Sequence, residues 1–134
     1  YAAPPTTQSQ FIDPLAEQPL DFLWLDLSAG TMMLTPIPEE GSLEYERAKF
    51  TIDVLRLNRE VIVKARENAY YGFLDRMQVY IQKKRDDAAP EELIQRLSEI
   101  RRAPHQTVRL EIGRQLAVTP IAQMGDHKSP ELFA

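Results

Sequence analysis

Hydrophobic and polar positions along the chain predict a short hairpin followed by a series of helices. Apolar residues at 22–27 and again at 31–34 flank a Ser-Ala-Gly turn, a pattern typical of two β-prone runs joined by a short loop. We therefore expect a β-hairpin over residues 22–34. Because an isolated hairpin is marginal in water, we expect its apolar face, with Trp24, to lie against helices.

Two helices are predicted directly after the hairpin. Ser42 suits an N-cap and is followed by glutamates that favour the positive end of a helix, so the first helix is expected over residues 42–57. Its apolar residues fall on two sides, which predicts that both sides are buried. Asn58 is the next cap candidate, and a long helix is expected over residues 59–86, with Phe73 in its apolar stripe.

Two shorter helices and two irregular ends complete the prediction. One proline, Pro90, and two glutamates before an apolar run, and arginines after it, indicate a helix over residues 90–102. Residues 106–116 fit the spacing of a helix and, in part, that of a strand, and we interpret them as a helix. Residues 117–134 are predicted to be an irregular tail and residues 1–10 a linker or a cut end. The predicted fold class is α+β, mostly α, as a single domain over residues 11–116.

Charge divides the chain into two parts. The first 46 residues contain eight acidic side chains and neither lysine nor arginine, whereas residues 47–115 contain fifteen basic side chains against ten acidic ones. The overall charge of −4 therefore conceals an acidic first third and a basic remainder. This division indicates a surface that meets a partner of opposite charge, or self-association between the two parts.

Composition excludes several classes of function. The chain has no cysteine, so disulfides, thiolate zinc sites and thiol catalysis are excluded, and a reducing cytoplasm is the expected compartment. No apolar run reaches the roughly 20 residues that span a bilayer, so no membrane segment is expected. Only two histidines are present and no glycine-rich phosphate loop occurs, and we expect no cofactor.

Acidic and histidine side chains are the first candidates for chemistry. Carboxylates around the hairpin could gather about a divalent cation, but their irregular spacing and neighbouring prolines and glycines favour turn-forming or solvated roles. These residues are Asp13, Glu17, Asp21 and Asp26. His105 could act as a general base, but no nucleophile or orienting group can be assigned to it, and His127 lies in the predicted tail. We predict no catalytic and no metal-binding residue.

Basic side chains form the remaining candidate site. Two clusters could make a phosphate-binding patch whose affinity depends on salt. The members of this candidate basic patch are Lys83, Lys84, Arg85, Arg101 and Arg102. Each cluster also ends a predicted helix, where the helix dipole alone favours cations.

The order of segments carries more information than any single side chain. The chain reads Phe-Ile-Asp-Pro at residues 11–14, then an apolar strand pair with a Ser-Ala-Gly turn, then RAKFTIDVLRLN at 47–58 and REVIVKARENAY at 59–70. This succession resembles the region downstream of the catalytic module in HNH endonucleases encoded beside ATPases in bacterial defence loci, including retron-associated and Septu-type proteins. The resemblance covers residues 11–71. Its motif positions are Asp13, Thr51, Leu55, Asn58, Arg59 and Arg66.

The resemblance implies an accessory domain, because the catalytic module itself is absent from the sequence. An HNH site uses histidines on a ββα-metal unit, and this chain has no histidine before His105. We interpret the motif positions as structural and expect a protein partner, such as the defence-locus ATPase, with nucleic acid reached through the parent protein. The alternatives are a freestanding regulatory or interaction domain and, third, an enzyme that uses carboxylates and a metal ion.

Overall fold

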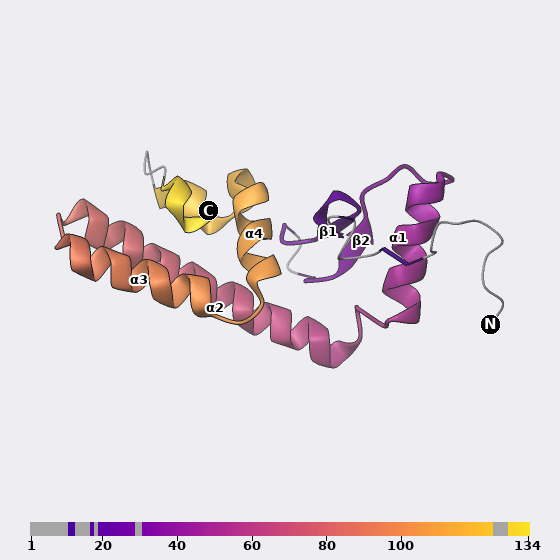
Figure 1. The fold of residues 1–134 in the computed structure, drawn as a ribbon, viewed down its shortest axis with the longest axis horizontal. Helices are drawn as coiled ribbons and strands as arrows, with labels where there is room; N and C mark the ends of the chain where they lie inside the picture. The colour runs from indigo at the N-terminus through magenta and orange to yellow at the C-terminus, as the bar shows by residue number, and fades with distance from the viewer. Residues whose placement is uncertain (1–10, 13–16, 18, 29–30, 125–128) are drawn as a thin grey trace. The chain divides into compact units, whose positions relative to one another are not determined.

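A computed structural model describes residues 11–12, 17, 19–28, 31–124 and 129–134 (Figure 1). The chain divides into two compact units. The first unit comprises residues 1–26 and 31–63, and the second comprises residues 27–30 and 64–134. The predicted residues Asp13 and His127 lie outside the described part of the chain.

The first unit contains a two-stranded antiparallel hairpin, β1 (Leu23–Leu25) and β2 (Leu34–Pro36), preceded by the short 3₁₀ helix η1 (Pro19–Asp21). Leu23 pairs with Pro36 and Leu25 with Leu34. The hairpin was predicted, but its second strand lies later than residues 31–34, because Met32 adopts a left-handed conformation (φ 53°) that keeps it out of the ladder.

The buried face of the hairpin differs from the expected one. Leu23, Leu25 and Leu34 are buried, whereas Trp24 points to the other face and is half-buried. Side chains alternate along a strand, so Trp24 lies on the opposite face from Leu23 and Leu25, and its packing against helices stays a prediction. Strand β2 packs against helix α1 (Leu43–Val54), so the predicted packing of the hairpin on a helix is confirmed.

Helix α1 begins as predicted and ends earlier than predicted. The Ser42 side chain accepts a hydrogen bond from the Tyr45 amide at 3.1 Å, as an N-cap does. At the other end the amide of Leu57 donates to Ile52 O and the amide of Arg56 donates to Asp53 O. These two bonds form a Schellman motif with Arg56 left-handed (φ 52°), which terminates the helix at Val54.

Burial along α1 is restricted to one face. Ala48, Thr51 and Ile52 are buried. Val54 and Leu55, which were expected to be buried, are 51% and 49% exposed. The prediction of a helix covered on two sides was therefore wrong at the C-terminal end of α1, because the chain turns away directly after Val54 and leaves Val54 and Leu55 exposed.

The second unit contains most of the long helix α2 (Glu60–Arg85), followed by α3 (Pro90–Arg102) and α4 (Gln106–Arg114). Helix α3 runs back along α2, and Lys83 of α2 forms an ion pair with Glu92 of α3 (Figure 1). Residues 106–114 are helical, which resolves the ambiguity between helix and strand. The core of this unit is formed by fully buried apolar side chains from all three helices: Phe73, Met77, Ile81, Ile100, Val108 and Ile112.

Short 3₁₀ helices follow α4. They are η2 (Leu116–Val118), η3 (Pro120–Met124) and η4 (Pro130–Leu132). Ile121 and Leu132 are buried in the second unit. The mostly helical α+β fold class is thus confirmed, and the boundary of the tail at residue 117 stays a prediction. No helix in the described residues is long and apolar enough to cross a membrane.

Replacement of Phe73 by Ala is expected to lower the free energy of unfolding by about 3–5 kcal/mol, because the ring is completely buried and the core would be left with a cavity. Urea denaturation followed by circular dichroism measures this change. Tyr71→Ala is the matched control on the same helix, since Tyr71 is 57% exposed, and should cost less than about 1 kcal/mol. Equal losses for the two variants would contradict the assigned core.

Candidate functional site

The motif residue Asn58 pairs with the hairpin. Its Oδ1 accepts a hydrogen bond from the amide of Leu34 at 2.7 Å, and its Nδ2 donates to the carbonyl of Leu34 at 2.9 Å. Helix α2 begins at Glu60, so Arg59 rather than Asn58 precedes the helix directly. The predicted cap role of Asn58 was wrong: the Schellman turn after α1 carries the side-chain amide to β2, where it binds as a neighbouring peptide group would.

Thr51 and Arg47 anchor the segment before the hairpin. Thr51 Oγ1 accepts a hydrogen bond from the amide of Ile12 at 3.1 Å and donates to Arg47 O at 2.9 Å. The Arg47 guanidinium donates to Phe11 O at 3.0 Å and to the Glu17 carboxylate at 2.8 Å. The hydrogen bond with Glu17 raises the pKa of Arg47 although burial lowers it.

The other described motif positions, Leu55, Arg59 and Arg66, bring no chemical groups together at one place. Leu55 and Arg59 are exposed, and the Arg59 guanidinium donates to Leu55 O at 3.3 Å and so covers the end of α1. Arg66 lies in the second unit, where it is buried, and burial lowers its pKa. The side chains of Thr51 and Asn58 therefore bind backbone groups of other segments of the first unit.

The acidic candidates have separate environments. Glu17 forms an ion pair with Arg47, Asp26 accepts a hydrogen bond from Thr31 Oγ1 at 3.3 Å, and Asp21 is exposed. Within the described residues, no group of three or more histidine, cysteine, aspartate or glutamate side chains could hold a metal ion. These carboxylates therefore stabilise turns and ion pairs where the structure describes them.

His105 precedes α4 in a left-handed conformation (φ 63°) and is exposed. It lines a shallow groove of about 360 Å³ with residues of α2, including Asn68, Gly72 and Arg76. These neighbours provide neither a serine nor a cysteine nucleophile and no carboxylate to orient the imidazole. The arrangement gives no support to a role for His105 as a general base.

Carboxylates occupy much of the candidate basic patch. Lys83 pairs with Glu92 at 3.2 Å, and Lys84 pairs with Glu131 at 2.6 Å. Arg101 donates to Glu131 O at 3.1 Å, so Glu131 brings Lys84 and Arg101 together. Arg85 and Arg102 are exposed. Two of the five predicted cations thus meet at one place, and the acidic residue between them would repel a phosphate.

Glu131 is the site residue that the sequence interpretation missed. Its Oε1 accepts hydrogen bonds from Tyr80 Oη at 2.7 Å and from Lys84 Nζ at 2.6 Å, and Ser129 Oγ lies 3.3 Å from the same ammonium. Burial raises the pKa of Glu131, but the hydrogen bonds from Lys84 and Tyr80 outweigh this effect and lower it. Burial and the hydrogen bond to Glu131 raise the pKa of Tyr80 to about 12.

This cluster is built for binding rather than for nucleophilic catalysis. A serine beside a lysine is one form of catalytic dyad, in which the neutral amine accepts the hydroxyl proton. Here the Glu131 carboxylate lies against the ammonium of Lys84, and an ammonium has no lone pair to accept a proton. The cluster therefore holds the segment that contains Ser129 and Glu131 against α2.

The lowered pKa of Glu131 predicts a dependence of stability on pH. Ionised Glu131 stabilises the folded state above the ordinary carboxyl pKa of 4.5, and this contribution is lost as pH falls through the lower folded pKa. The unfolding free energy should therefore differ between wild type and Glu131→Gln at neutral pH, and the difference should shrink below about pH 4.5. Chemical denaturation of both proteins at intervals of about one pH unit, from about pH 3 to about pH 8, measures this difference.

Glu99→Gln, at an exposed glutamate of α3, is the control. A difference between wild type and Glu131→Gln that stays constant down to about pH 3 would contradict the assigned ion pair.

Replacement of Asn58 by Ala is expected to cost about 1–3 kcal/mol of unfolding free energy, because both backbone groups of Leu34 lose their partner. Asn58→Asp should cost at least as much, since it keeps an acceptor but places a negative charge beside the Leu34 carbonyl. Asn68→Ala, at an exposed asparagine of α2, is the control, with a change within about 0.5 kcal/mol. Equal effects at positions 58 and 68 would show that the pairing contributes nothing.

The comparisons with known proteins do not change this interpretation of the site. No protein-family model, no curated protein and no solved structure matches this chain. The resemblance of residues 11–71 to HNH endonucleases therefore stays a prediction from the sequence.

Proposed function

We propose that this chain is a non-catalytic accessory domain of an HNH-endonuclease-like protein, and that its first unit binds a protein partner with a basic, partly apolar surface. The sequence resemblance supplies the family. The observation that carries the binding role is an exposed surface of the first unit in which large apolar side chains stand among glutamates.

This surface follows the hairpin and continues into α1. Ile37 is 44% exposed and Leu43 is 60% exposed. The glutamates between and directly after them are all exposed: Glu39, Glu40, Glu44 and Glu46. We call residues 37–46 the acidic–apolar edge. Apolar side chains surrounded by charged ones are typical of a surface that a partner covers.

Helix α1 extends the apolar part of this surface. At about 100° per residue, positions 43, 50 and 54 fall on one side of the helix, within roughly 40° of one another. Leu43 and Val54 are more than half exposed there, and Phe50 between them packs against Phe11 with ring centroids 4.9 Å apart. A partner that bound this side would cover a continuous apolar stripe of α1 in addition to the acidic–apolar edge.

Charge favours protein over nucleic acid as the partner. The exposed glutamates of the acidic–apolar edge repel phosphates, whereas lysines and arginines of a protein would pair with them. In the second unit, Lys83 and Lys84 are each paired with a glutamate. Nucleic acid would then be contacted by the parent protein, and the ATPase of the defence locus is the partner that the resemblance implies.

A matched pair of substitutions tests this proposal. Leu43→Ser should weaken binding to the ATPase encoded beside the gene about tenfold or more, as expected when an apolar residue at the centre of an interface is removed. Ile94→Ser is the control, since Ile94 on α3 is 66% exposed but lies in the other unit. Binding should also weaken as salt increases. Calorimetry with the purified chain and ATPase measures both effects.

Three outcomes would contradict the proposal. Absence of an ATPase gene and of a histidine-bearing catalytic segment in the parent gene would favour the alternative, a freestanding interaction domain. Submicromolar binding of the chain to duplex DNA at physiological salt, lost in Lys84→Ala, would favour nucleic acid. Metal-dependent cutting of DNA or RNA that is lost in Asp21→Asn or Asp26→Asn would favour the carboxylate enzyme.

A further inference from the structure

The last described segment of the chain, residues 129–134, is bound in the second unit much as a peptide is bound by a recognition domain. Helix side chains supply the donors and the segment supplies the acceptors. Helix α2 binds the Glu131 carboxylate through Tyr80 and Lys84, and α3 binds the Glu131 carbonyl through Arg101. Three helices converge on this segment, because α4 also contributes a donor.

The donor from α4 is the buried side chain of Arg109. Its guanidinium donates to Leu132 O at 2.8 Å and to Ala134 O at 3.1 Å, while Gln106 Oε1 accepts from its Nε at 2.6 Å and fixes its orientation. Burial lowers the pKa of Arg109. A buried guanidinium that binds two backbone oxygens recognises the main chain of the segment rather than a particular side chain.

Apolar contacts supply side-chain selectivity. Leu132 is completely buried, and Phe133 lies over Gly113 of α4. A Cβ atom at Gly113 would lie 2.7 Å from the Phe133 ring, so a larger residue at this position would force the ring to move. The segment also carries its own local fold, since the amide of Leu132 donates to Ser129 O and that of Phe133 donates to Pro130 O.

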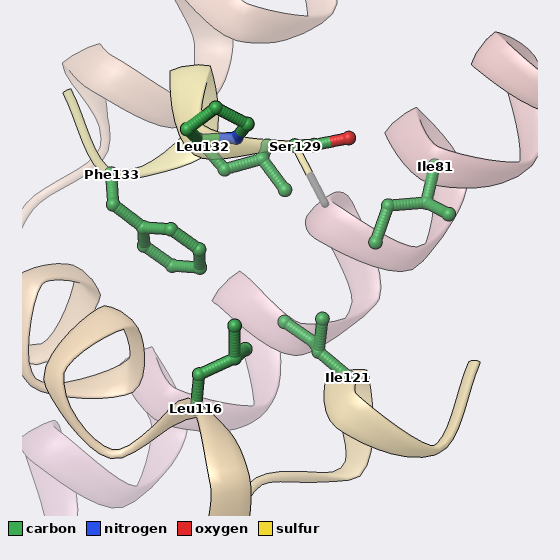
Figure 2. Close-up of a pocket in the computed structure, with 7 residues that line it drawn as sticks. Ile81, Leu116, Ile121, Ser129, Leu132 and Phe133 are labelled. Atoms are coloured by element: carbon green, nitrogen blue, oxygen red, sulfur yellow. The ribbon is translucent and has the colours of Figure 1, made fainter. Parts of the chain in front are cut away.

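The segment leaves part of its binding groove unfilled. A hollow of about 310 Å³ lies between Ile81, Leu116 and Ile121 on one side and residues of the segment on the other. Figure 2 shows Leu132 and Phe133 facing Leu116 and Ile121 across it. The hollow is partly open to solvent, so the apolar side chains that line it offer contact surface that the segment does not cover.

We propose that the groove formed by α2, α3 and α4 recognises a short Pro-Glu-Leu-aromatic segment of a partner protein, and that residues 129–134 occupy it as an internal competitor. Glu131 defines the charge of the ligand, because Lys84 pairs with its carboxylate, whereas Arg101 binds its backbone carbonyl. Leu132 and Phe133 define its apolar part. A partner segment with a bulkier apolar group would fill the hollow and displace the internal one. This site lies in the second unit and does not depend on the acidic–apolar edge.

The test weakens the binding of residues 129–134 in the groove of the full chain and supplies a peptide ligand separately. Glu131→Ala combined with Leu132→Asp removes the anchor carboxylate and the buried side chain. A fluorescent peptide, Ser-Pro-Glu-Leu-Phe-Ala with blocked ends, is then titrated by anisotropy. We expect it to bind this variant at least about tenfold more tightly than wild type, in which the internal segment competes.

Adjacent lysines provide the matched control. In the weakened chain, Lys84→Ala should reduce peptide affinity about tenfold, and Lys83→Ala should leave it unchanged, because Lys83 pairs with Glu92 instead. Equal affinity of the peptide for wild type and the weakened variant, or no binding to either, would overturn the proposal. A concentration-dependent dimer of wild type in light scattering would also overturn it, by identifying a second copy of the chain as the occupant.

A second variant keeps the proposal open to refutation if the first one does not fold. Gly113→Ala places a methyl group where Phe133 lies, without altering the segment itself. This variant should prefer a peptide with glycine in place of phenylalanine, and wild type should show the opposite preference. The same preference in both proteins would mean that the peptide does not occupy the groove.

Discussion

Backbone groups that no neighbouring helix or strand pairs with need other hydrogen-bond partners, and in this chain side chains of helices, or of the turns beside them, supply several of these partners. In the first unit, Asn58 pairs with Leu34, and Thr51 with the amide of Ile12. In the second unit, Arg109 binds the carbonyls of residues 132 and 134. Both units therefore use polar residues of helices, or of the turns beside them, to fix short irregular stretches that could not stay folded alone.

This constraint explains which parts of the fold could be predicted. Helix α3 has its predicted bounds, because Pro90 and the flanking charges mark both ends in the sequence. Helix α1 ends three residues before its predicted end, since its Schellman motif places arginine in the left-handed position where glycine is usual. Asp87 after α2 is left-handed in the same way. The local sequence at Arg56 contains no signal for this turn.

The contacts of the candidate site were harder to predict from the sequence than the ends of the helices. Lys83, Lys84 and Arg101 appear as like-charged clusters in the sequence, and the helix dipole accounts for them. Their acidic partners include Glu131, which lies 47 positions after Lys84 and within a segment interpreted as an irregular tail. Its signal was present in the order Pro-Glu-Leu-Phe, in which a charged residue next to two large apolar ones is unusual for a solvated tail. A count of charged residues cannot identify such an ion pair, because it carries no information on which residues lie close together in the folded chain.

Ion pairs within each unit also affect how the division of the sequence into an acidic and a basic part is interpreted. Arg47 neutralises Glu17 in the first unit, and Glu131 and Glu92 neutralise two lysines in the second. Ion pairs within a unit leave its net charge unchanged, but they place these opposite charges beside one another. The glutamates of the acidic–apolar edge, in contrast, face solvent beside exposed apolar side chains. This exposed charge is the part of the charge division that the proposed basic partner would meet, and it lies in the unit whose Asn58 and Thr51 side chains bind the hairpin and the segment before it.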